Sequence, residues 1–167
     1  MGYAATRLPG GDTLAAVAVA NASGDVLAED GGVLGGPRGD RGELLRSAEL
    51  IRDMPQLPAW ALPAGQSTTL ACVCTDAALD KRGCGIVARI ASAGIARAVD
   101  PAFTPLDGDV VFCLASGPGR PAAPGTAASW SVTVLGTAAA SLTAAAIRDA
   151  VRQAGSSALR PRSSSQS

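Results

Sequence analysis

The sequence predicts a layered α/β fold in a chain of 167 residues. Segments typical of apolar strands alternate with segments whose apolar residues recur at helical spacing, and this order favours helices packed on a sheet. Apolar residues make up 47% of the chain but aromatic residues only 3%, so Ala, Val, Leu and Ile must build the core. Because the strands are continuously apolar, we expect both faces of the sheet to be covered.

The first part of the chain contains two predicted strands, a loop and a helix. Residues 13–20 follow a Pro-Gly-Gly turn and predict a strand, and residues 26–28 predict a short return strand. The glycine-rich segment 29–42 has neither the P-loop nor the dinucleotide-binding spacing and is interpreted as a loop. Residues 43–54 have helical periodicity. The apolar stripe of this helix is Leu44, Leu45, Ala48 and Ile51.

The middle of the chain predicts a linker, a strand and a long helix. Three prolines between residues 55 and 65 indicate an extended linker that leads into a strand over 68–75. Residues 78–99 predict a helix capped by Asp80, with Gly94 allowing close packing. The apolar stripe of this helix is Val87, Ile90, Ala91, Ile95 and Ala98.

The last part of the chain predicts two strands and a final helix. Residues 107–116 indicate a turn and a strand, and a loop of low complexity follows over 117–128. Residues 129–135 alternate in polarity, which predicts another strand, and the alanine-rich segment 138–154 predicts a helix. Residues 155–167 offer nothing to bury and are expected to be disordered.

Composition excludes several classes of function. Lys and Arg number 14, as do Asp and Glu, so we expect neither a nucleic-acid nor a membrane partner. No stretch reaches the roughly 18 apolar residues of a membrane span. The apolar run 13–22 is short and follows an acidic turn, which argues against a signal peptide and favours a cytoplasmic location.

The chain contains no histidine, which excludes Ser-His-Asp and Cys-His catalytic groups and any His-ligated metal. Cys72 and Cys74 share one face of a strand, but Cys84 and Cys113 are isolated in the sequence. A four-cysteine zinc site needs two tight pairs, so we expect packing thiols, no metal and no cofactor.

A cluster of hydroxyl residues begins the strand at 68–75, directly after the linker. A threonine there becomes a competent nucleophile if the peptide bond before it is cut. An N-terminal threonine has its own base, because its α-amino group titrates at about 7.7–8.0. The absence of histidine is then no obstacle to acyl transfer.

Three stretches in order resemble the DmpA-type family, the L-aminopeptidase/D-esterase group, which includes nylon-oligomer hydrolases. They are RLPGGDTLAAVAVANASGDVLAEDGGVL near the start, STTLACVCTDAALDK, and GIARAVDPAFTPLDGDVVFCLASG. The resemblance implies a self-processing hydrolase of the N-terminal-nucleophile-like type with a four-layer αββα sandwich. It implies one domain over 1–154, divided into 1–67, with a linker at 54–67, and 68–154, followed by the tail 155–167.

The family pattern also implies site residues. Thr68 matches the nucleophile, and Ser67-Thr68 matches the cleaved bond. Asn21 matches an asparagine near the developing oxyanion, and Asp107 and Asp109 match an acidic pair beside the nucleophile. From the residues alone, each has a structural alternative: Thr68 as a strand residue, Asn21 as a turn residue, and the Asp-Gly-Asp segment as a tight turn.

Two differences from the family pattern leave alternatives open. Position 67 is Ser where the family more often has Asn, and a lysine-containing stretch of the family precedes the part matched here. The sandwich is therefore expected to be incomplete, as a fragment, a partner of a separate half or a decayed copy.

The expected substrate is a short peptide, amide or ester, and the expected partner is a second copy or the missing N-terminal half. The alternatives are a glutamate N-acetyltransferase-like acyltransferase and an inactive truncated subunit. The aromatic residue in DGDVVF favours the hydrolase over the acyltransferase.

Overall fold

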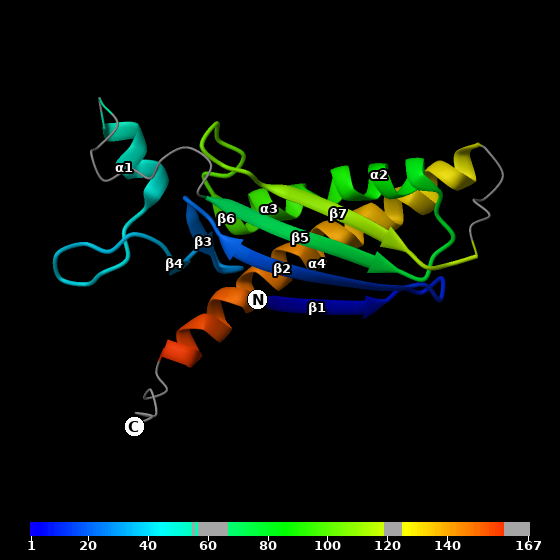
Figure 1. The fold of residues 1–167 in the computed structure, drawn as a ribbon, viewed down its shortest axis with the longest axis horizontal. Coiled ribbons are helices and arrows are strands. Elements are labelled where there is room, and N and C mark those ends of the chain that lie inside the picture. The colour runs from blue at the N-terminus through cyan, green and yellow to red at the C-terminus, as the bar shows by residue number, and fades with distance from the viewer. Residues whose placement is uncertain (55, 57–66, 119–124, 159–167) are drawn as a thin grey trace, which may run out of the picture.

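The computed structural model describes residues 1–54, 56, 67–118 and 125–158, which form two sheets and a layer of helices (Figure 1). The larger sheet has the strand order β1-β2-β5-β7, and the smaller one β4-β3-β6. All strand pairs are antiparallel except β5 with β7, which is parallel. The strands are β1 (Gly2–Arg7), β2 (Thr13–Asn21), β3 (Asp25–Leu27), β4 (Val33–Gly35), β5 (Thr68–Thr75), β6 (Val99–Asp100) and β7 (Val110–Ala115). The helices are α1 (Ser47–Asp53), α2 (Lys81–Ala91), α3 (Ala93–Ala98) and α4 (Thr126–Ala158).

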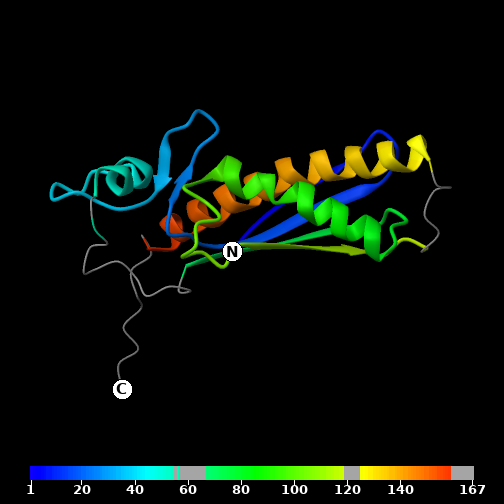
Figure 2. The same cartoon turned by 90° about the horizontal axis from the view of Figure 1, so that it is seen from above.

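One face of the larger sheet is covered by α2 and α4, and α3 packs on α4 and on the smaller sheet (Figure 2). Burial alternates along β5, where Thr69, Ala71, Val73 and Thr75 are buried and their neighbours are not. The helices contribute Val87, Ile95 and Ile147 to the same core. This arrangement confirms the predicted α/β layering, with mostly small aliphatic residues in the core.

The opposite face of the larger sheet is open in the described part of the chain, so the expectation that both faces are covered is not met there. Large apolar side chains lie exposed on it, including Leu70 (44% exposed), Phe112 (58%) and Leu114 (60%). Because apolar residues occupy both faces of β2 and β5, hydropathy did not show that only one face is buried. The described residues therefore form one helix layer and one sheet layer of a sandwich.

The final helix is longer than predicted. Helix α4 includes residues 129–135, so the prediction of an alternating strand there was wrong. The β-branched residues in 129–135 favour a strand only weakly. In the helix, Thr133 Oγ1 donates a hydrogen bond to the Ser129 carbonyl oxygen at 2.8 Å, a bond that Ser and Thr side chains commonly form with the residue four positions earlier. The buried residues Leu135, Ala139 and Leu142 follow the helical spacing of the following segment. Tertiary packing of this stripe outweighs the local alternation.

Helix α4 is also long and apolar enough, by length and composition alone, to cross a membrane, contrary to the sequence expectation. It packs along β1, β2, α2 and α3. Part of its apolar surface is buried in the core of this fold, where Ala146 and Ile147 are completely buried.

Several element boundaries differ from the predictions. β1 was not predicted, and β4 lies within the segment interpreted as a loop. Helix α1 covers only part of 43–54, and the predicted helix 78–99 is two helices followed by β6. Helix α4 continues to Ala158, four residues into the predicted tail. Residues 159–167, the linker residues 55 and 57–66, and residues 119–124 lie outside the described residues.

Two local predictions are confirmed. Asp80 caps α2, since its Oδ1 accepts a hydrogen bond from the Gly83 N–H at 2.7 Å. Gly94 allows close packing of α3 on α4, because an added Cβ would lie 2.2 Å from the Ala140 carbonyl oxygen.

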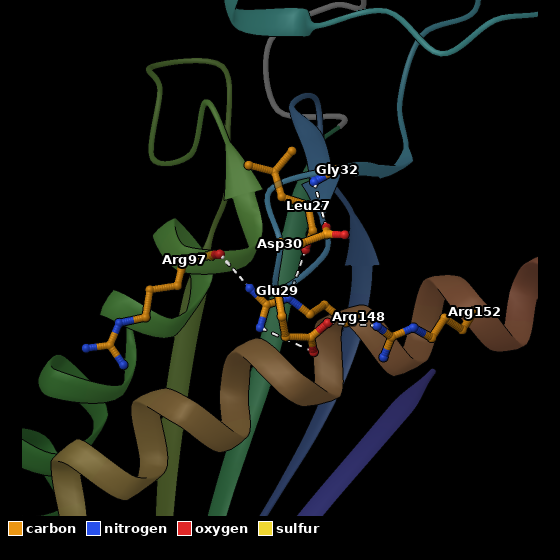
Figure 3. A network of polar contacts seen from close by, with 7 residues as sticks. All are labelled: Leu27, Glu29, Asp30, Gly32, Arg97, Arg148 and Arg152. Atoms are coloured by element: carbon orange, nitrogen blue, oxygen red, sulfur yellow. Dashed lines mark hydrogen bonds and ion pairs between the residues drawn. The ribbon is translucent and has the colours of Figure 1, made fainter.

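A polar network connects α4 to the smaller sheet (Figure 3). The Arg148 guanidinium donates to the carbonyls of Leu27 (2.8 Å) and Arg97 (2.9 Å), and Arg152 pairs with Glu29 at 2.9 Å. The side chain of Arg148 is only 13% exposed. These bonds hold the β3–β4 hairpin at the end of the larger sheet where β2 finishes and β5 begins.

Candidate active site

Thr68, the candidate nucleophile, is the first residue of β5 and lies beside the end of β2. Asn21 is its direct partner across the antiparallel pair, so the two side chains share the open face of the sheet. Thr68 is half-buried and Asn21 is exposed. The structure therefore places together two candidates that are 47 positions apart in the sequence.

The carbonyl before Thr68 accepts two hydrogen bonds. Thr68 Oγ1 donates to the Ser67 oxygen at 2.7 Å, and the Gly108 N–H donates to the same oxygen at 2.9 Å. Ser67 is buried, with 4% of its surface exposed. The hydroxyl thus lies next to the carbonyl that it would attack, and a backbone N–H points at the oxygen that would become negatively charged.

Asp109 lies next to Thr68, and both of its carboxylate oxygens accept hydrogen bonds from backbone N–H groups. Its Oδ1 accepts from the Thr69 N–H at 2.7 Å, and its Oδ2 accepts from the Phe103 N–H at 3.1 Å. These two bonds join the start of β5 to the loop that precedes β7. The geometry supports a positioning role for this carboxylate.

Asp107 forms a second carboxylate bridge on the other side of Gly108. It accepts hydrogen bonds from the Ser23 hydroxyl and, at 2.9 and 2.7 Å, from the N–H and the hydroxyl of Thr104. Burial alone would raise the pKa of Asp107, but the bonds from Ser23 and Thr104 outweigh it and hold the pKa below its ordinary value. This carboxylate stays ionised at neutral pH and fixes the loop after β2 beside the Asp-Gly-Asp turn.

Sequence reasoning missed Gly108, Ser23 and Thr104. A Cβ added at Gly108 would lie 2.8 Å from Thr68 Oγ1, so the glycine allows the turn to approach the Thr68 hydroxyl closely. The available signal was a glycine enclosed by two acidic residues in a family motif. Ser23 had no signal beyond its turn, because its bond to Asp107 spans 84 positions.

The four cysteines lie apart from this site. Cys72 and Cys74 point to the same face, as predicted, with their sulfurs 3.9 Å apart. All four are free thiols, and burial together with the nearby Cys84 raises the pKa of Cys113 to about 12. Among the described residues, no three His, Cys, Asp or Glu side chains gather as a metal site.

Comparison with known proteins identifies the family. The model of Peptidase family S58 matches residues 1–162. An uncharacterized aminopeptidase of Mycobacterium tuberculosis is 36% identical over 157 residues, which cover 88% of this chain and 46% of the relative. The chain therefore spans about half the length of the curated relatives that it matches.

Two solved structures share the fold at a TM-score of 0.54 and 18% identity, each covering 89% of this chain. One is a protein from Pyrococcus horikoshii OT3, of which 38% is covered. The other is the L-aminopeptidase D-Ala-esterase/amidase of Ochrobactrum anthropi, described as a variant of the Ntn hydrolase fold, of which 39% is covered. The αββα-type sandwich class and the DmpA-type resemblance are thereby confirmed, and this chain belongs to peptidase family S58.

Proposed function

We propose that this chain carries the nucleophilic half of an aminopeptidase-type hydrolase that cuts its own backbone between Ser67 and Thr68. The observation that supports this most strongly is the Ser67 carbonyl, whose oxygen accepts from both the Thr68 hydroxyl and the Gly108 N–H. A hydroxyl next to a carbonyl that is polarised by a fixed donor supports acyl transfer, for which Oγ1 must turn from the carbonyl oxygen toward the carbonyl carbon.

The self-processing reaction proceeds in two steps. Thr68 Oγ1 attacks the Ser67 carbonyl carbon, the C–N bond breaks, and an ester joins Ser67 to the Thr68 side chain. The hydroxyl proton passes to the nitrogen that leaves, which becomes the α-amine of Thr68. Water then hydrolyses the ester, releasing the Ser67 carboxylate and the free hydroxyl.

In the mature site, the Thr68 α-amine takes the proton of its own hydroxyl as Oγ1 attacks a substrate carbonyl. The acyl group transfers to Oγ1, the amine of the substrate leaves with a proton, and water hydrolyses the acyl ester. Asn21 is the proposed side-chain donor to the oxyanion, since it lies opposite Thr68 on the same face. Asp107 and Asp109 act as positioning residues that hold the turn and the strand start.

The test measures the intact mass of three purified proteins: the native chain, Thr68→Ser and Thr68→Ala. The native chain should convert to two fragments that meet at Ser67-Thr68, Thr68→Ser should still be cut, and Thr68→Ala should remain whole. Both steps use a hydroxyl, which serine supplies and alanine lacks. Uncut native protein, or equal cutting of Thr68→Ala, would contradict the mechanism and leave the inactive subunit as the better description.

The substrate class follows from the same chemistry: short peptides, amides or esters with an accessible acyl group. The match to a peptidase family supports hydrolysis over the acyltransferase alternative. Hydrolysis of an amino-acid p-nitroanilide, compared with acetyl transfer from acetylornithine, separates the two.

We also propose that the open sheet face is an interface with a second sheet. Apolar surface is exposed on this face by Val19, Leu70, Phe112 and Leu114. Two sheets that pack face to face, about 10 Å apart, bury side chains of this kind between them. The proposed occupant is a second copy of this chain, so the native chain should be a dimer by light scattering and Phe112→Ser combined with Leu114→Ser should be a monomer. A monomeric native chain, or a variant that remains a dimer, would contradict an interface between copies.

A further inference from the structure

A cleft of about 940 Å³ lies directly beside the candidate active site. Four segments form its described walls: the turn after β2, the chain after β4, helix α1, and the loop before β7. In Figure 1 these segments lie together at the left end of the larger sheet. The volume falls within the roughly 300–1,000 Å³ of small-molecule sites.

The cleft is continuous with the reacting bond, because Asn21 and Ser67 both line it. In the self-processing reaction, Ser67 is the residue that is transferred to the Thr68 hydroxyl. The residue that a substrate transfers in the mature site must therefore take the place of Ser67. Because Ser67 lines the cleft, the cleft is the space available to the side chain of that residue.

The chemistry of the walls selects against charge. None of the described lining residues is a Lys, Arg, Asp or Glu. The walls expose apolar side chains instead, including Ile51 (55% exposed) and Leu106 (37% exposed), together with Leu50 and Met54. A charged group in this cleft would lose hydration without gaining a partner, whereas an apolar group would be transferred out of water.

The α1 wall is attached to the body of the protein by a buried carboxylate. Asp25 is 1% exposed, and its Oδ2 accepts from the Ser47 N–H at 2.8 Å while Oδ1 accepts from the Ser47 hydroxyl. Ser47 begins α1, so these bonds fix the start of the helix that carries Leu50 and Ile51. The exposure of Ile51, which the sequence placed on a buried stripe, is explained by its position on this wall.

We propose that the cleft binds the uncharged apolar side chain of the residue that is transferred to Thr68, with leucine- or phenylalanine-sized groups preferred. This proposal rests on the proposed function, because it identifies the transferred residue by the position of Ser67. Substrates with a lysine or glutamate side chain at that position are disfavoured.

The test compares p-nitroanilides of leucine, phenylalanine, alanine, lysine and glutamate with the full processed chain. The leucine side chain buries three more carbons than the alanine side chain, so kcat/KM should be tens of fold higher for the leucine anilide than for the alanine anilide. The ratio of the leucine anilide to the lysine anilide should be larger still. Ile51→Lys should remove the leucine preference and raise relative activity toward glutamate. Val134→Lys, a matched exposed apolar position outside the cleft, should leave the preference unchanged.

The outcomes separate this proposal from the proposed function. A processed chain that hydrolyses the alanine and leucine anilides equally overturns the cleft assignment and leaves the nucleophile intact. If the processed chain hydrolyses no anilide, binding of L-leucinamide and L-lysinamide to that processed chain is measured by ligand-observed NMR. Preferential leucinamide binding that Ile51→Lys abolishes supports the cleft, and equal binding of the two amides overturns it.

Discussion

Replacing Gly108 by alanine tests whether the turn between the two carboxylates positions the Thr68 hydroxyl, the proposed nucleophile. An alanine Cβ would lie 2.8 Å from Thr68 Oγ1, about 0.6 Å short of the 3.4 Å at which ordinary contact begins. The backbone of the turn is held on both sides by Asp107 and Asp109, so the Thr68 side chain is the easier group to move. Rotation of that side chain takes the hydroxyl away from the Ser67 carbonyl.

The expected effect is on rate rather than on folding. A misplacement of about 1 Å can cost about 100-fold in rate, so a shift of about 0.6 Å should slow self-cleavage at Ser67-Thr68 by roughly 10- to 100-fold. Gly108 is exposed and its backbone lies outside the left-handed region, so alanine is tolerated by the fold. The backbone N–H that donates to Ser67 remains present.

The assay follows the fraction of intact chain over time by mass spectrometry, with circular dichroism as a check of folding. Gly10→Ala is the matched control, because a Cβ there meets nothing within 4 Å. It should be cut at the native rate. If folded Gly108→Ala is also cut at the native rate, the close approach of the turn does not position the hydroxyl, and the reasoning fails.

Further predictions concern stability and thiol reactivity. Arg148→Met should lower the free energy of unfolding by about 2–4 kcal/mol, because it removes two charge-assisted hydrogen bonds, whereas the more exposed Arg152→Met should cost less than about 1 kcal/mol in urea unfolding. Thr143→Val should raise that free energy by about 1 kcal/mol, since the buried Thr143 hydroxyl has no partner among the described residues; a loss of stability would contradict this. The depressed pKa of Asp107 contributes stability that is present above the unfolded pKa of about 3.9 and is lost as pH falls through the lower folded value. As pH is lowered through this range, the urea midpoint of Asp107→Asn should therefore fall less steeply than that of the native chain. At pH 8, Cys113 should be the last thiol of the folded chain to react with iodoacetamide, because its pKa near 12 keeps it protonated.

Local sequence predicted the chemistry of this protein only together with the family resemblance. The absence of histidine and a threonine after a proline-rich linker suggested an N-terminal threonine nucleophile, and the resemblance assigned Thr68 and the Asp-Gly-Asp turn to the site, which stays a prediction. Strand β5, the Asp80 cap and the apolar stripe of α2 and α3 were also predicted, because short-range periodicity and capping are properties of neighbouring residues.

Tertiary structure decided what those residues contact. The strand predicted at 129–135 is helix because Val132 and Leu135 join the core in register with the buried stripe of the rest of α4. The local alternation of polarity does not contain that information. The roles of Gly108 and Asp109 depend on the parallel pairing of β5 with β7, which brings residues 40 positions apart within hydrogen-bond distance. The sequence could name the carboxylates, but only the fold shows that they hold backbone N–H and hydroxyl groups and that a glycine N–H is directed at the Ser67 carbonyl.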